Sequence, residues 1–110
     1  MSIEKLEYQT PWYAVGSNSL RLQTELAAEV GRDHPLYGRD MRAVAVRQDC
    51  DDVLFVSVDE PQVVAVVHLT WSGRPEREPR WPETMFFTSI EDWIERGMMV
   101  DHADYRILEN

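Results

Sequence analysis

The run Val63-Val64-Ala65-Val66-Val67-His68-Leu69-Thr70-Trp71 is the most apolar stretch of the 110-residue chain. It is rich in β-branched residues and contains neither glycine nor proline. This composition is typical of a β-strand that has protein on both faces. We therefore predict a strand over residues 62–71 and expect it to organise the fold.

Two further strands are predicted before this run, over residues 41–48 and 52–58. The segments that separate the three strands, Asp49-Cys50-Asp51 and Asp59-Glu60-Pro61, are short. Parallel pairing needs a long crossover connection, so short connections predict antiparallel hairpins.

The alternation of side chains predicts a register for these hairpins. Pairing Val58 with Val63, and Gln48 with Asp52, gathers apolar residues on one face. That predicted core face comprises Val44, Val46, Leu54, Val56, Val58, Val63, Ala65, Val67, Leu69 and Trp71. The opposite face comprises Ala43, Ala45, Val53, Phe55, Ser57, Val64, Val66, His68 and Thr70. This second face turns polar around His68, so we expect it to be half covered, by the N-terminal arm or by another subunit.

An amphipathic helix is predicted over residues 18–30. Leu22, Leu26 and Val30 recur every four residues and form its apolar stripe. Glu29 falls on the other side of the helix together with Glu25, where we expect solvent.

A second helix is predicted over residues 89–97. Either Thr88 with Glu91 or Ser89 with Asp92 has the spacing of an N-terminal cap, and Gly97 is expected to end the helix. Residues 84–88 are a candidate fourth strand at the edge of the sheet. The prediction is thus a single α+β domain over residues 1–110, with three to four antiparallel strands and two helices.

The charge of the chain limits its partners. Twenty acidic and 11 basic side chains give a formal net charge of −9. Nucleic acid and anionic lipid are bound through Lys and Arg, so we expect neither as a partner. The longest apolar run is too short to cross a bilayer. A basic protein partner would be favoured by the same field.

Cys50 is the one cysteine of the chain, which excludes an internal disulfide framework and fits a reducing compartment. The segment Met1-Ser2-Ile3-Glu4-Lys5 lacks the basic-then-apolar order of a secretory signal, so we expect a cytoplasmic location. Asp49, Asp51 and Asp52 surround the thiol, and their charges would raise its pKa. A nucleophilic role for Cys50 is therefore not predicted.

The common catalytic signatures are absent from the sequence. It contains no phosphate-binding G-x-x-x-x-G-K-[ST] loop, no dinucleotide glycine fingerprint, no H-E-x-x-H and no G-x-S-x-G. A zinc finger would need more thiolates than one cysteine supplies. We therefore predict no catalytic residue, no metal and no cofactor, and we favour a non-enzymatic protein.

The three histidines fall in different predicted segments: His34 in a loop, His68 near the end of the central strand and His102 in a C-terminal turn. If the loop and the turn fold back over the polar part of the sheet, a pocket would form. The candidate pocket residues are His68, Thr70, Phe55, His34 and His102. A metal site of His68, His102 and Asp101 or Asp104 is an alternative, but a packed strand histidine is favoured because the spacing lacks ligand geometry.

Residues 72–83 hold three prolines and a glycine and are predicted to be a loop. Trp and Arg are enriched at interface hot spots. The candidate interface residues are Trp71, Arg74, Arg77, Arg80 and Trp81. The alternative is that the tryptophans cover the open end of the core while the arginines pair with Glu76, Glu78 and Glu83.

The segment His68-Leu69-Thr70-Trp71-Ser72-Gly73, followed by Trp81-Pro82 and Ile90-Glu91-Asp92-Trp93, resembles small single-domain bacterial proteins of unassigned function. The resemblance covers about the second half of the chain. It implies no activity, catalytic residue or cofactor.

The leading functional hypothesis from the sequence is a protein-interaction module, of the inhibitor or immunity type, that masks a basic site. The alternative is a small ligand- or metal-binding domain, or an enzyme, with a site around His68. A homodimer built on the half-apolar face is a third reading.

Overall fold

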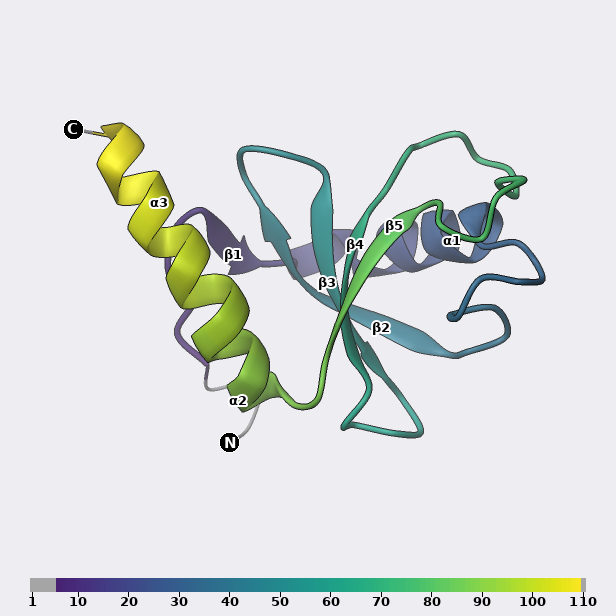
Figure 1. The fold of residues 1–110 in the computed structure, drawn as a ribbon, viewed down its shortest axis with the longest axis horizontal. Coiled ribbons are helices and arrows are strands. Elements are labelled where there is room, and N and C mark those ends of the chain that lie inside the picture. The colour runs from purple at the N-terminus through teal and green to yellow at the C-terminus, as the bar shows by residue number, and fades with distance from the viewer. Residues whose placement is uncertain (1–5, 110) are drawn as a thin grey trace.

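Short turns between apolar runs produce an antiparallel meander in the computed structural model, which describes residues 6–109 (Figure 1). The strands β1 (Trp12–Ala14), β2 (Met41–Arg47), β3 (Asp52–Ser57), β4 (Val64–His68) and β5 (Glu83–Phe87) follow the same order in the sheet as in the chain. The α+β class and the antiparallel sheet are confirmed, although the sheet has five strands instead of three to four. The segment examined for a secretory signal, residues 1–5, lies outside the described residues.

The predicted register of the β3–β4 hairpin is wrong by one residue. Val53 faces Val67 and Phe55 faces Ala65 across the two strands. The Ser57 amide donates to the Val63 carbonyl at 3.0 Å and closes the hairpin, so Val58 lies in the turn and is 54% exposed. A slip of one residue moves every side chain to the opposite face. The predicted core face therefore mixed residues from both sides of the sheet.

The predicted pairing of Gln48 with Asp52 is also wrong by one residue, because Val46 faces Val53 next to the turn, and a β-bulge in β2 then shifts the register again. Ala43 faces Phe55, whereas Ala45 faces Leu54, so Val44 is an extra residue between the two pairs. A bulge interrupts the alternation of side chains. Val44 and Ala45 consequently both pack on the same side of the sheet.

Both faces of the sheet are covered within the chain. Helix α1 (Ser19–Glu29) packs on one face, where the core comprises Leu22, Leu26, Val30, Leu36, Met41, Ala43, Val53, Phe55, Ala65, Val67 and Leu69. The other face packs on the C-terminal helix, and its core comprises Trp12, Val44, Ala45, Leu54, Val56, Val64, Phe87, Ile90, Trp93 and Met98. The N-terminal arm adds Leu6 and Tyr8 to this second core. No second subunit is needed to bury either core within the described residues 6–109.

The C-terminal helix continues past Gly97, where the sequence predicted its end. It comprises α2 (Ile90–Trp93), a π-helical turn (Ile94–Met98) and α3 (Met99–Glu109). Ser89 accepts a hydrogen bond from the Asp92 amide at 3.0 Å, so it is the cap among the two predicted alternatives. Gly97 lies against Trp93: an added Cβ would be 2.7 Å from the indole Cδ1. This glycine permits close packing and does not terminate the helix.

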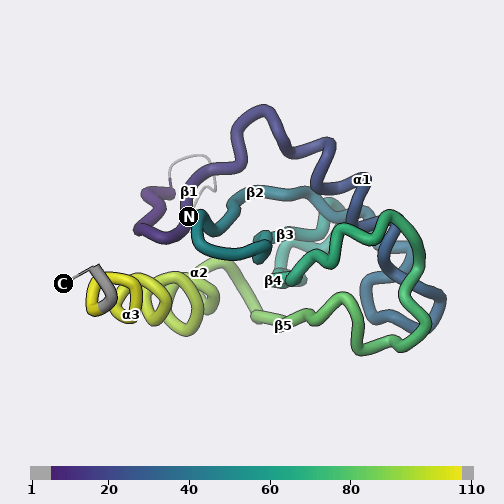
Figure 2. The backbone as a smooth tube through the Cα atoms, turned by 90° about the horizontal axis from the view of Figure 1, so that it is seen from above, coloured from purple at the N-terminus to yellow at the C-terminus, as the bar shows by residue number. Residues whose placement is uncertain are grey.

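The two helical regions lie at opposite ends of the sheet, with α1 at the far end from α3 (Figure 2). Among residues 6–109, no helix is both long and apolar enough to cross a membrane. The C-terminal helix covers one end of its sheet face and leaves the end around His68 open, which creates the site described next.

Candidate functional site

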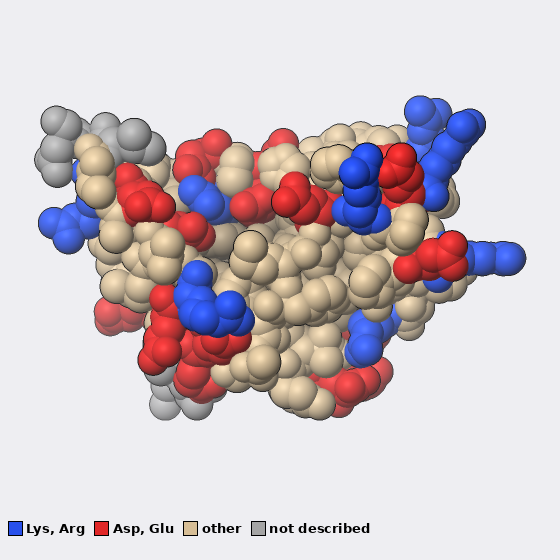
Figure 3. Space-filling model, viewed as in Figure 1, with Lys and Arg blue, Asp and Glu red and all other residues tan. Residues whose placement is uncertain are grey.

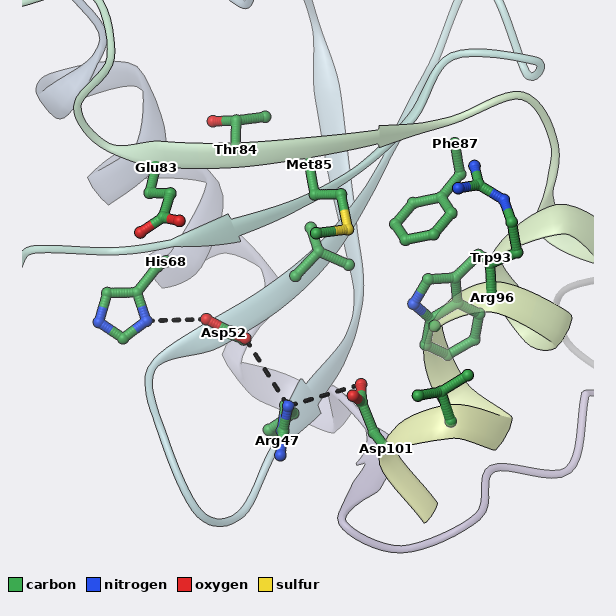
Figure 4. Close-up of a pocket in the computed structure, with 13 residues that line it drawn as sticks. Arg47, Asp52, His68, Glu83, Thr84, Met85, Phe87, Trp93, Arg96 and Asp101 are labelled. Atoms are coloured by element: carbon green, nitrogen blue, oxygen red, sulfur yellow. Dashed lines mark hydrogen bonds and ion pairs between the residues drawn. The ribbon is translucent and has the colours of Figure 1, made fainter. Parts of the chain in front are cut away.

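A row of polar side chains crosses one end of the sheet. The register pairs Trp12 with Arg47 and Asp52 with His68, and it pairs His68 with Glu83. Arg47 and Asp52 complete the row, since an ion pair of 3.9 Å joins them. The four polar side chains come from β2 to β5, and Figure 4 shows them along one edge of an open face beside α3.

Arg47 is held in place by several carboxylates. Its guanidinium donates to Asp49 at 2.9 and 2.8 Å, and it lies 3.5 Å from Asp101 of α3. The hydrogen bond with Asp49 raises the pKa of Arg47, and the same contact lowers the pKa of Asp49. Asp101 also accepts from the Trp12 indole at 2.9 Å. These contacts tie the hairpin end of the sheet to the C-terminal helix and neutralise the guanidinium charge.

His68 and Glu83 are the accessible members of the row. His68 Nδ1 lies 2.8 Å from Asp52 Oδ1, and the imidazole side chain is 48% exposed. The Glu83 carboxylate has no hydrogen-bond or ion-pair partner among the described residues. The row therefore offers an imidazole and an unpaired carboxylate to a ligand.

A cavity of about 580 Å³ lies between this row, strand β5 and the C-terminal helix. Its walls are partly polar and partly apolar. The lining residues are Arg47, Asp52, Val66, His68, Glu83, Thr84, Met85, Phe87, Trp93, Arg96, Gly97, Val100 and Asp101. Such a mixture of apolar wall and convergent polar groups is typical of a small-molecule site.

Trp93 forms the floor of the cavity. Its side chain is fully buried, and Tyr8 and Trp12 hold it edge-on with ring centroids 6.2 and 5.2 Å away. The indole nitrogen has no hydrogen-bond partner within residues 6–109, and Figure 4 shows it turned towards the centre of the cavity. Leaving such a donor unsatisfied costs about 1–3 kcal/mol.

Arg96 stands at the other end of the cavity. Its guanidinium lies 5.1 Å from the centre of the Phe87 ring and pairs with Asp92 one turn earlier in the helix at 2.5 Å. This pairing keeps the pKa of Asp92 well below its usual range. Arg96 is thus positioned as a wall of the cavity with its charge already compensated.

Of the five predicted pocket residues, His68 alone lines this cavity. Phe55 is buried in the core on the α1 face, and the Thr70 hydroxyl donates to Glu76 at 2.8 Å. His34 is buried, with Nε2 3.0 Å from the Pro82 carbonyl. His102 Nδ1 lies 2.7 Å from the Thr10 carbonyl. The structure therefore does not bring the three histidines together.

The predicted interface loop runs along the α1 side of the molecule. Trp71 and Trp81 are each 38% exposed. Arg21 lies over Trp71 at 4.8 Å, and Arg80 lies over Trp81 while pairing with Glu78 at 2.6 Å. The side chains of Arg74 and Arg77 are exposed.

Glu29 fixes the start of this loop, although the sequence placed it in solvent. Its carboxylate is fully buried and accepts from the Thr70 and Trp71 amides at 2.8 and 2.9 Å. Trp71 is held there at φ 59°, a left-handed conformation that is uncommon outside glycine. Burial, followed by the hydrogen bond with Glu25, raises the pKa of Glu29 to about 7.

Sequence reasoning missed two parts of the site. Trp93 was not a candidate residue, because an unsatisfied indole is not visible in a sequence, and Gly97 was expected only to end the helix. The second part is a group of Cys50, Asp52 and His68, whose potential ligand atoms all lie within 4.8 Å of one another. The correct hairpin register would have placed Asp52 opposite His68. Partial burial, with the Asp52 and Asp49 charges, raises the pKa of the Cys50 thiol.

Comparison of the chain with protein-family models, with curated proteins and with solved structures finds no match.

Proposed function

We propose that the protein is a ligand-binding domain whose site is the cavity between the His68 row and the C-terminal helix. The observation that carries this proposal is the buried Trp93 indole, which lines the cavity and has no hydrogen-bond partner within residues 6–109. Buried donors are almost always satisfied. The nitrogen is itself buried, so a ligand acceptor would supply the missing bond by displacing the cavity wall beside Trp93.

The walls of the cavity indicate the class of ligand. Val66, Met85, Phe87 and Val100 offer an apolar surface for a hydrocarbon or aromatic body. Carboxylates outnumber guanidinium groups around the site: Asp49, Asp52, Glu83, Asp92 and Asp101 surround Arg47 and Arg96. Coulomb repulsion therefore disfavours an anion. The preferred ligand is a neutral or cationic small molecule with an apolar body.

The carboxylates around the cavity form part of an acidic region of the molecular surface. Figure 3 shows acidic side chains gathered beside an uncharged central area of the same face on which the cavity opens. This arrangement supports a ligand that places its apolar part inside and any positive charge at the rim. The single cysteine also supports a reducing, cytoplasmic location, which we propose with it.

N-phenyl-1-naphthylamine and its sulfonated analogue 1-anilinonaphthalene-8-sulfonate test this proposal, since they share a ring system and differ in charge. We expect the neutral probe to bind with enhanced fluorescence, and the anionic probe to bind more weakly. Val100→Trp, which fills the cavity from α3, should abolish binding of the neutral probe. Ile107→Trp, on an exposed position of the same helix outside the cavity, should leave it unchanged. Equal binding by both variants would contradict the proposal.

A second candidate function is a protein-interaction module. It is favoured by the way in which the loop that begins at Trp71 and continues through residues 72–83, here called the Trp71 loop, is held in place. The buried Glu29 carboxylate holds the loop in a strained conformation, with Trp71 and Arg74 exposed. Strain of this kind is found at functional sites, and a preorganised loop binds at a lower entropic cost.

Alanine variants of two exposed aromatic residues, Trp71 and Tyr37, test whether a partner binds through this loop or adheres to any exposed aromatic side chain. A partner recovered by affinity purification should be retained by Tyr37→Ala and lost by Trp71→Ala. If the net charge steers the encounter, the association rate should also fall steeply with salt. Equal retention by both variants would remove the loop from the interface.

A further inference from the structure

The turn between β2 and β3 and the end of β4 bring together three different metal-binding side chains. The Cys50 sulfur, an Asp52 carboxylate oxygen and a His68 imidazole nitrogen all lie within 4.8 Å of one another. Cys50 and His68 are exposed and Asp52 is half-buried, so the group is accessible from solvent. No other group of this kind occurs within residues 6–109.

The chemistry of the three side chains selects a class of ion. A thiolate together with an imidazole favours zinc and its neighbours in the first transition row, whereas magnesium and calcium prefer oxygen ligands alone. The surrounding charge also favours a cation. Asp49 and Asp51 flank Cys50. The nearby Arg47 lies 3.9 Å from Asp52, and its charge is shared with the closer Asp49 and Asp101.

We propose that Cys50, Asp52 and His68 bind a divalent transition-metal ion of the zinc type. Metal–ligand bonds of about 2.0–2.3 Å require the three side chains to close around the ion, and Cys50 can move because it lies in an exposed turn. The thiol releases its proton to solvent when the metal–sulfur bond forms. The Asp52–His68 hydrogen bond is exchanged for bonds to the metal.

Three protein ligands leave a fourth tetrahedral position for water or a ligand group. Asp52 and His68 also line the cavity, so this metal ion would lie at the cavity rim. The proposal goes beyond the ligand-binding function and does not require an organic ligand in the cavity.

Titration of the full chain with Co²⁺, which replaces Zn²⁺ in such sites and absorbs visible light, tests the proposal. We expect one ion per chain, with sulfur-to-cobalt charge-transfer absorption. Cys50→Ser should remove that absorption. His68→Gln should weaken binding at least about tenfold, because loss even of residues that only orient a ligand costs about 10–100-fold. His102→Gln is the matched control, since His102 contacts the Thr10 carbonyl instead, and it should bind as the wild type does.

Circular dichroism of each variant shows that it is folded, which separates lost ligation from lost structure. Absence of charge-transfer absorption in the folded wild type would overturn the proposal, and so would an unchanged spectrum in folded Cys50→Ser. Val100→Trp fills the cavity and should retain Co²⁺ binding. Failure of the metal site and failure of the cavity site can therefore be told apart.

Discussion

Glu29 illustrates how a single side chain can depart from the pattern of its helix. Its position in the sequence predicts the exposed side of α1, yet the carboxylate is buried and binds two amides of the Trp71 loop. The helix pattern describes only contacts within α1 and the sheet, and the loop that covers Glu29 begins about 40 residues later. The periodicity of a helix does not show that a segment far along the chain buries one of its side chains.

Burial of Glu29 predicts a specific dependence of stability on pH. The pKa of Glu29 is about 7 in the folded chain, against an ordinary value of 4.5. Between these values the folded state keeps a proton that the unfolded state loses. The free energy of unfolding should therefore fall as pH rises from about 4.5 to about 7, by at most about 1.4 kcal/mol per pH unit.

Urea unfolding of the wild type and Glu29→Gln at several pH values measures this effect. The variant cannot ionise at position 29 and should show a smaller fall over the same range. Glu95→Gln, at an exposed position of the C-terminal helix, should keep the wild-type pH dependence. Identical pH dependence in the wild type and Glu29→Gln would show that the carboxyl does not titrate in this window.

At the scale of the elements, local patterns identified the strands better than they identified their pairing. Runs of β-branched residues located β2 and β3 closely, whereas β4 occupies only Val64–His68 of the predicted 62–71. Strand β5 overlaps the predicted fourth strand. The register depended on where each turn closes, and a one-residue difference at Val58 reversed the faces. The bulge at Val44 leaves no signal in a sequence where Ala43, Val44 and Ala45 are all apolar.

His68 is the one residue of the candidate site that was predicted from the sequence. His68 was placed at the polar end of the central strand, where the cavity lies, because residues 64, 66 and 68 change from apolar to polar along one face. The rest of the cavity wall comes from β5 and the C-terminal helix. Their position over the sheet depends on packing between distant segments, which residue periodicity does not describe.

Gly97 gives a prediction about the C-terminal helix. Replacing glycine by alanine in a helix usually stabilises it by about 1 kcal/mol. Here the new Cβ would lie 2.7 Å from Cδ1 and 2.9 Å from Nε1 of Trp93, a buried ring that Tyr8 and Trp12 hold. Overpacking of this kind costs about 1–3 kcal/mol, so Gly97→Ala should destabilise the protein.

Thermal and urea unfolding measure this change, with Glu95→Ala as the control in the same π-helical turn. Glu95 is exposed, and its replacement should alter the free energy of unfolding by less than about 0.5 kcal/mol. A Gly97→Ala variant that is more stable than the wild type would mean that the indole can move away from the helix.

At the scale of the whole molecule, the chain covers both faces of its sheet and still leaves one polar end open. The net charge of −9 and the carboxylates at the cavity rim act in the same direction, against anionic ligands. The Trp71 loop lies on the α1 side and the cavity on the side of the C-terminal helix. A small ligand and a protein partner would therefore use different surfaces.

The most direct test of the central claim is the indole N–H resonance of Trp93 in a ¹⁵N correlation spectrum, assigned with Trp93→Phe and followed during titration with N-phenyl-1-naphthylamine. Occupation of the cavity predicts a saturable shift of the Trp93 resonance that is larger than any change at Trp71 and Trp81, which do not line the cavity. A Trp93 resonance that stays in place while the probe fluorescence rises would place the probe elsewhere and contradict the assignment of this cavity as the binding site.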